Sequence, residues 1–465
     1  MRASSIGSHG FRVSSVALSV ALLLGATELS AQQGREQVLQ LRSGRAAGDL
    51  AAMFEGKVER QSRLEWGAWS SPSFLSFSDV DNDKSSANTL HSLAILDQRL
   101  WGRWDGAGGQ TAYLRARYLD LRYDLSEGGS RPTIFEEGLT LDLGYYDFRW
   151  GNWQIRTGRQ YHSIGRGLVF DGNLDGMKAT FRQGQWEMHA VGGKTPRYAT
   201  DLDPNVGRSR RNLMGLSMSH ATPNDHRIFA YWFAQDQRGH VEVDFQGLDY
   251  DSEYFAVGAE GPVRNDVVYY LEAIQENGLS AELGRPIGGE PVDANALLAE
   301  LEFRPDRRHH PTMQVRLAHG SGDPDRQSVV TNFQGNVRLT DDTAFVGLGQ
   351  FDGGLALSPR LANLNVLSVG TTYNLLEPPK DDDILTLALT GHVYRKDDAE
   401  GVISNPAGNL NSPDVGKGLD LRAAYRPGHD LTVTLHASRF MPGAAFEPLT
   451  RVDSTLVYAS FTYSY

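Results

Sequence analysis

The chain of 465 residues lacks several features that would define its class. It contains no cysteine, so a disulfide framework is excluded. Beyond residue 31 no stretch approaches about 20 consecutive apolar residues, so we expect no membrane-spanning helix. Positive charge is in deficit, with 45 Lys and Arg against 57 Asp and Glu, and the net charge of −12 argues against a nucleic-acid partner.

Common catalytic motifs are also missing. The sequence has neither a G-x-S-x-G elbow nor an H-E-x-x-H helix motif. His309 and His310 precede a proline near a predicted strand start, and His162 and Ser163 are adjacent, so their side chains point to opposite faces. A Ser/His/Asp set at one rim stays possible, but no sequence feature points to it. We therefore predict no enzymatic activity and no cofactor.

One loop has the spacing of a calcium site. Residues 79–84 read D-V-D-N-D-K, which matches the D-x-D-x-D start of a calcium loop. Lys84 stands where such a site needs glycine, and Leu90 stands where its bidentate glutamate belongs. We expect these loop carboxylates to be solvated and to bind no metal. Calcium binding by this loop is the alternative.

The most informative feature present is the final strand. Residues 455–465 read T-L-V-Y-A-S-F-T-Y-S-Y, so that apolar and polar side chains alternate with period two up to a terminal tyrosine. Outer-membrane β-barrels end in this way, because one face of the strand meets lipid and the last ring lies in the interfacial girdle. An ordinary amphipathic edge strand is the alternative.

The amino-terminal end predicts export. Arg2 and Arg12 precede a short apolar stretch, 16–25, and small residues up to Ala31 suit a signal-peptide cleavage site. We expect residues 1–31 to be a signal peptide, 32–55 a periplasmic lead-in, and 56–465 one barrel domain.

The barrel region repeats one theme: a segment of 9–14 residues alternates, and turn residues follow. Nineteen such segments are discernible, and 343–351 fits worst. Because single-chain bacterial barrels have even strand numbers, we predict an all-β transmembrane antiparallel barrel of the outer-membrane porin type, with 16–18 strands and 18 preferred. Longer polar stretches are expected to form extracellular loops: 78–89, 195–210, 277–294, 321–342 and 397–416.

Arginines recur within the alternating segments. A lipid-facing arginine at bilayer depth costs roughly 2–4 kcal/mol, so those in mid-strand should face the lumen. Rings of such residues select anionic solutes, although they could equally pair with lumenal carboxylates and stiffen the wall. The candidate pathway residues of this kind are Arg115, Arg117, Arg156, Arg159, Arg182, Arg422 and Arg439.

The densest mixture of arginine, aspartate and glycine lies at 156–176. It could form a constriction in which Arg156 and Arg159 grip carboxylates, while Asp171 and Asp175 keep binding weak enough for release. Strict alternation places Arg156 in the lumen and Arg159 on the lipid side. Either a bulge separates them or Arg159 lies near an interface.

Four short segments carry a family resemblance: T-G-R-Q at 157–160, A-H-G-S-G-D-P at 318–324, R-L-A-N-L-N-V-L-S-V at 360–369 and the strand pair at 415–446. Together they resemble the alginate export family of 18-stranded outer-membrane barrels. The resemblance implies passive passage of an anionic polysaccharide through an electropositive constriction. It makes Arg159 the first candidate, followed by Arg156, Arg422 and Arg439.

The preferred hypothesis is therefore a monomeric channel in the bacterial outer membrane that passes an anionic, alginate-like oligo- or polysaccharide. Its expected partners are outer-membrane lipids, the saccharide and possible periplasmic export or uptake machinery, with no nucleic acid. The alternatives are a general or small-anion porin, a barrel enzyme active at its rim, and a barrel that sheathes a partner protein.

Overall fold

The computed structural model describes residues 63–85, 91–106, 108–124, 134–196, 211–236, 251–282, 285–307, 309–326, 329, 339–376, 383–405, 407–428 and 430–465. The predicted signal peptide and lead-in lie outside the described residues. Within them, no helix is long and apolar enough to cross a membrane.

The described chain forms one sheet of 18 strands. The strands are β1 (Arg63–Ser78), β2 (Ser92–Asp105), β3 (Thr111–Asp124), β4 (Ile134–Trp150), β5 (Trp153–Ile164), β6 (Phe170–Gln183), β7 (Trp186–Lys194), β8 (Asn212–Ala221), β9 (Arg227–Asp236), β10 (Asp251–Arg264), β11 (Val267–Glu282), β12 (Arg285–Phe303), β13 (Thr312–Gly320), β14 (Leu364–Leu376), β15 (Ile384–Arg395), β16 (Asp414–Arg426), β17 (Leu431–Pro442) and β18 (Ser454–Ser464).

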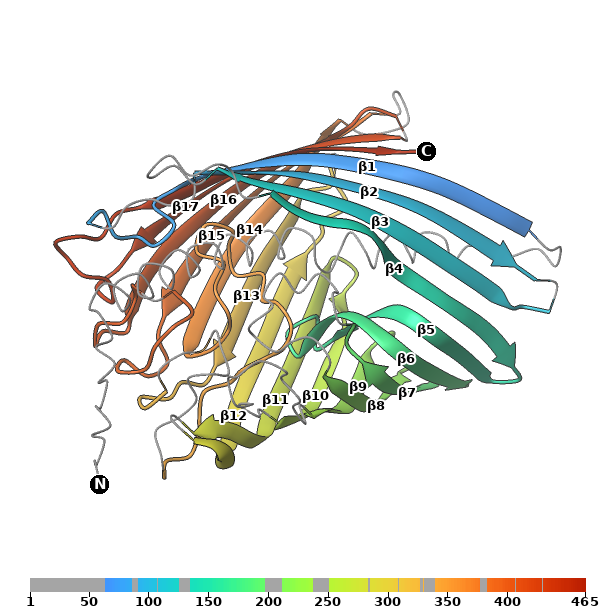
Figure 1. Ribbon diagram of the computed structural model, residues 1–465, viewed down its shortest axis with the longest axis horizontal. Coiled ribbons are helices and arrows are strands. Elements are labelled where there is room, and N and C mark those ends of the chain that lie inside the picture. Colours follow the sequence, from blue (N-terminus) through green and yellow to red (C-terminus); the bar gives the residue numbers. More distant parts are fainter. Residues whose placement is uncertain are drawn as a thin grey trace, which may run out of the picture.

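The sheet closes on itself, because β1 pairs antiparallel with β2 on one side and with β18 on the other. Every other strand pairs with its neighbours in sequence, which produces the barrel in Figure 1. Closure leaves no unpaired strand edge, so the backbone groups of the wall are hydrogen-bonded within it. The predicted antiparallel barrel and the preferred count of 18 are confirmed, and 343–351 is not a strand.

Each strand presents one face outward and one toward the lumen. On β7 the exposed side chains of Trp186 and Met188 alternate with the half-buried Glu187 and His189. Large apolar side chains of the outward set are exposed around the barrel, as expected for a surface that meets lipid. We call these two sets the outer face and the lumenal face.

The two ends of the barrel differ. Short turns such as residues 151–152 and 184–185 join strands at one end, and long connections such as 321–363 join them at the other. Short turns are periplasmic in bacterial barrels and long loops extracellular.

The predicted loop at 277–294 is wrong, because most of these residues extend β11 and β12. Alternation continues there, with Val292 and Ala294 buried on the lumenal side.

Candidate functional site

The lumen narrows where the β5–β6 hairpin leaves the wall and curves into the barrel (Figure 1). Gly158, Gly176 and Gly193 face one another in register across β5, β6 and β7. A Cβ atom on Gly176 would lie 2.1 Å from the carbonyl oxygen of Gly192, and one on Gly193 would lie 2.5 Å from that of Asp175. Only glycine permits this close approach of backbones, so this row sets the bend.

The tip of the hairpin is fixed to the lumenal face of β10, β11 and β12 by Arg166. Its guanidinium lies 3.2 Å from a carboxylate oxygen of Glu300 and 3.5 Å from one of Glu260. It also lies 3.7 Å from the ring centroid of Tyr270, a cation–π contact. The hairpin thus starts from β5 and β6 and is held by carboxylates on β10 and β12 and by an aromatic ring on β11.

A second element, residues 341–363, also enters the lumen, and we call it the inner loop. Its backbone meets the hairpin tip through three hydrogen bonds: Leu348 N–H to Val169 O at 3.0 Å, Gly349 N–H to Leu168 O at 3.1 Å, and Gln350 N–H to Gly167 O at 2.8 Å. A Cβ atom on Gly349 would lie 1.7 Å from Gly167 O, so glycine is required at this junction. The hairpin and the inner loop therefore form one crossing of the lumen.

The inner loop is anchored first on β10 and β11. The Val346 N–H donates to a Glu276 carboxylate at 2.8 Å, and the Tyr254 hydroxyl donates to Val346 O at 2.7 Å. Phe345 and Val346 are buried in the large apolar cluster that also contains Leu168 and Val169 of the hairpin.

Further along, the inner loop is anchored on β15, β16 and β17. The Leu355 N–H donates to Asp420 at 3.3 Å, and the Ala356 N–H donates to Ser438 at 2.8 Å. Leu355 also packs in an apolar cluster with residues of β1, β2, β3 and β18, including Leu75. The loop consequently contacts the wall on several sides of the lumen and cannot move as a free flap.

Asp420 belongs to a buried Ser–His–Asp chain that the sequence did not announce. Ser368 Oγ lies 2.8 Å from His392 Nδ1, and His392 Nε2 lies 3.0 Å from Asp420 Oδ2. Because Asp420 also holds the Leu355 N–H, this chain supports the inner loop, and its residues lie under that loop.

One side of the lumen is rich in arginine. We call the lumenal face of β2–β6 the basic wall. Its charged side chains alternate with outer-face residues, and bases outnumber acids among those described: Arg99, Arg103, Arg115, Arg117, Arg149, Arg156, Lys178 and Arg182, with Asp97, Asp105, Asp142 and Asp147.

At the centre of the basic wall, three arginines share two aspartates. Arg117 makes two hydrogen bonds to Asp97, at 3.1 and 3.2 Å, and Arg99 contacts the same carboxylate. Arg115 donates to Asp142 at 2.6 Å, and Arg99 reaches Asp142 at 3.0 Å. Both expectations for these arginines therefore coexist: they lie in the wall of the lumen, and they are paired with carboxylates, with one positive charge in excess.

Three other predicted residues also lie on the lumenal face. Arg156 donates to Asp147 at 2.8 Å, and Arg182 lies near the short-turn end with Glu187 at 3.1 Å. Arg422, next to Asp420 on the same face of β16, makes no ion pair with any described carboxylate and is exposed. It is a fixed positive charge available to a solute.

Contrary to expectation, Arg159, Asp175 and Arg439 lie on the outer face. The register of β5 with β4 and β6 runs without a bulge, and Arg159 pairs with Asp175 at 2.6 Å beside the exposed Met177. Arg439 shares a face with the exposed Leu435. Side chains on this face cannot line the pathway, since alternation turns them away from it.

Asp171 lies within the β5–β6 hairpin, on the hairpin face that also carries Asp175, and accepts a short hydrogen bond from the Tyr161 hydroxyl. Its predicted part in a constriction stays a prediction.

An acidic wall lies on the lumenal face of β10–β12. The sequence analysis did not predict it, although the glutamates recur there at alternate positions. Its members lie at inward-facing positions of these three strands: Glu260, Glu272, Glu276, Glu290, Glu300 and Glu302. Glu272 is buried and accepts hydrogen bonds from Tyr231 at 2.8 Å and Tyr270 at 2.7 Å.

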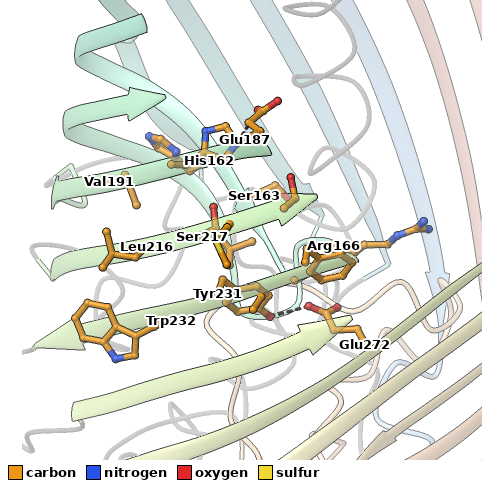
Figure 2. A pocket seen from close by; sticks show the side chains of 18 of the residues that line it. His162, Ser163, Arg166, Glu187, Val191, Leu216, Ser217, Tyr231, Trp232 and Glu272 are labelled. Atoms are coloured by element: carbon orange, nitrogen blue, oxygen red, sulfur yellow. Dashed lines mark hydrogen bonds and ion pairs between the residues drawn. The ribbon is translucent and has the colours of Figure 1, made fainter. Parts of the chain in front are cut away.

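A cavity of about 360 Å³ lies against β5–β11 beside the hairpin tip. Figure 2 shows its lining, with Tyr231 and Glu272 joined by a hydrogen bond and with Arg166, His162 and Glu187 around the same space. Basic and acidic side chains both reach it. Among the described residues no group of His, Asp and Glu side chains suits a metal ion.

One sequence-family model matches the part of the chain that contains most of these strands. The alginate export family model matches residues 141–460. This chain belongs to the alginate export family. No curated protein sequence matches it significantly.

Solved outer-membrane barrels of Pseudomonas aeruginosa have a similar fold. OccK1 (OpdK) aligns with a TM-score of 0.53 and 10% identity over 86% of this chain and 99% of that chain. OccK7 (OpdD) gives 0.51 and 12% over 86% and 99%, and OpdK with vanillate gives 0.53 and 10% over 86% and 99%. Family and fold together identify an outer-membrane channel of the porin type, and give no support to an enzyme.

Proposed function

We propose that this channel passes an anionic oligo- or polysaccharide of the alginate type along its basic wall. The observation that supports this most is the excess of basic over acidic side chains on the basic wall. Its buried cluster of Arg99, Arg115 and Arg117 shares only two aspartates, and Arg149 on this wall and Arg422 on β16 are exposed. Guanidinium groups bind carboxylates through paired hydrogen bonds, and a uronate chain offers one carboxylate per sugar.

Passage requires binding that is favourable but weak. Carboxylates already paired with the arginines lower the affinity of the basic wall for a solute, so that an anion exchanges from site to site. The acidic wall across the lumen repels the same anion and restricts it to the basic side. Arg422 and Arg149, which make no ion pair with described residues, add attraction outside the central cluster.

A small organic anion is the second candidate, and the narrowing favours it. The hairpin and inner loop cross the lumen, and the adjoining cavity of about 360 Å³ suits a small molecule better than a polymer. The structure of OpdK with vanillate, an aromatic carboxylate, supports this alternative by similarity of fold.

Single-channel recording with alginate oligomers of defined length tests the proposal. We expect block of the current that strengthens from monomer to longer oligomers and weakens at least several-fold in Arg422→Gln and Arg156→Gln. Arg439→Gln is the matched control, because it removes an arginine from the outer face. Block by monomeric uronate alone would favour the small-anion channel, and absence of any block would contradict both. Monomeric assembly and a periplasmic partner stay predictions.

A further inference from the structure

The ion pair of Arg159 and Asp175 lies on the outer face, away from the solute pathway. Arg159 donates through Nε and Nη2 to the two carboxylate oxygens of Asp175, at 2.6 and 2.7 Å. Charged side chains on a face that meets lipid are costly to the fold, because hydration is lost there. The pair therefore requires a compensating contact with the strands around it.

The pair stands at the row of residues where the β5–β6 hairpin leaves the wall (Figure 1). β5 pairs with β4 only as far as Arg159, which faces Gly144. β6 pairs with β7 only as far as Asp175, which faces Lys194. Beyond this row, within the residues that the structure describes, β5 and β6 pair with each other and with no other strand. Arg159 and Asp175 thus face each other at the base of the part of the hairpin that crosses the lumen.

The departure of the hairpin leaves one edge of β4 without a strand partner. Residues 134–143 of β4 pair with β3 and with no described residue of β5. Side chains of the hairpin take the place of the missing strand. Arg159 Nη1 donates to Leu141 O at 2.7 Å, and Asn173 Nδ2 donates to Asp142 O at 3.0 Å. Backbone carbonyls in a barrel wall need such donors, since lipid supplies none. Arg159 therefore joins β4, β5 and β6 at the point where the hairpin departs.

The lumenal side of the same row permits the bend. Gly158 has a φ of 115°, and a Cβ atom there would lie 2.3 Å from Gly144 O. Gln160 is buried on this side, and its Nε2 donates to Gly176 O at 3.3 Å. Where two strands bend toward the lumen, their inner side is crowded and suits glycine, whereas the outer side opens and has room for a long side chain. The T-G-R-Q segment at 157–160 thus supplies both sides of one bend.

We propose that Arg159 is a positioning residue for the constriction. Together with Asp175 and Leu141 O, it fixes the angle at which the hairpin crosses the lumen, and thereby the width of the pathway. The far end of the hairpin is held separately, by Arg166 and by the inner loop. Arg159 does not contact the solute and acts on it through the hairpin. This role applies to any solute that the channel passes, so it does not depend on the proposed saccharide.

Single-channel conductance of the full chain in KCl measures the width of the pathway without any saccharide. Arg159→Gln removes the ion pair, and Asp175→Asn removes the charge that holds Arg159 but leaves its hydrogen bond to Leu141 O. We expect the conductance to rise roughly twofold in Arg159→Gln, because current follows the cross-section of the narrowest part of a pore. The rise should be smaller in Asp175→Asn and in Arg159→Lys, whose ammonium group still pairs with Asp175.

Arg439→Gln is the matched control. Arg439 is also an outer-face arginine with an aspartate partner, since it donates to Asp453 at 2.9 Å. It lies on β17, which does not pair with β5 or β6. The conductance of this variant should equal that of the wild-type chain. Heat-modifiable migration on electrophoresis reports whether each variant is folded.

A purely structural pair would lower the melting temperature and leave the conductance of the folded channel unchanged, and that result in Arg159→Gln and Asp175→Asn overturns the proposal. An equal rise in Arg439→Gln overturns it as well, because the effect would then belong to any outer-face charge. If Arg159→Gln does not fold, Asp175→Asn and Arg159→Lys decide by the same measurement. Loss of the folded form in all three assigns the pair to barrel stability and also overturns the proposal. A rise confined to variants of the pair supports it.

Discussion

Replacing Arg166 by glutamine should loosen the crossing of the lumen. In the wild-type chain Arg166 pairs with Glu260 and Glu300 and covers the ring of Tyr270. The substitution removes the charge and leaves the backbone hydrogen bonds between Leu348 and the tip in place. The hairpin should therefore remain in the lumen, but its tip should detach more often from β10, β11 and β12.

The size of the effect can be bounded. The Arg166 side chain is 40% exposed, so each ion pair is screened and contributes about 0.2–1 kcal/mol. The cation–π contact adds about 0.5–1 kcal/mol. The sum of about 1–3 kcal/mol corresponds to a shift of roughly 5- to 150-fold in the equilibrium between the bound and the released hairpin tip.

Current recordings of single channels in planar bilayers measure this shift directly. We expect more frequent transitions to a higher conductance in Arg166→Gln than in the wild-type chain. Arg182→Gln, which removes a lumenal ion pair far from the tip, is the control and should show the wild-type pattern. Identical gating in Arg166→Gln and the wild-type chain would refute the anchoring role of Arg166.

Two further substitutions follow from close contacts in the wall. Gly176→Val should prevent the bend, because its Cβ would lie 2.1 Å from Gly192 O; we expect loss of the folded, heat-modifiable form on electrophoresis, and normal folding would disprove the steric argument. Asp97→Asn should leave Arg99 and Arg117 short of a buried partner and lower the unfolding free energy by about 3–5 kcal/mol, as thermal melting in detergent would show; an unchanged melting temperature would contradict it.

The barrel was predictable because a bilayer imposes a period of two on every strand. Strand positions and the lipid-side position of Arg159 follow from that alternation. The strand number needs the preference for even counts as well, because nineteen segments alternate. The same rule applied to β17 would have placed Arg439 outside, since Leu435 and Ala437 share its face. The cost of a lipid-facing arginine and the family resemblance both favour the lumen for these two arginines, and side-chain periodicity is the better guide.

The narrowing was not predictable from the sequence. The glycine row at Gly158, Gly176 and Gly193 lies on three strands, so its alignment appears only with the register. The inner loop does not form a strand, because its backbone N–H groups donate to scattered side chains of the wall, such as Glu276 and Asp420. No regular side-chain period therefore predicts its position. Charge pairing across strands, such as that of Arg99 with Asp142, likewise depends on register. The acidic wall, in contrast, follows from the period of two on β10–β12.

The charge selectivity of the open channel tests the central claim most directly. The zero-current potential across a KCl gradient at low ionic strength, where screening is weak, reports whether anions or cations pass. A lumen governed by the basic wall predicts anion selectivity, reduced when Arg422 and Arg149 are both replaced by glutamine. Cation selectivity of the wild-type channel would show that the acidic wall governs passage, and would contradict the account.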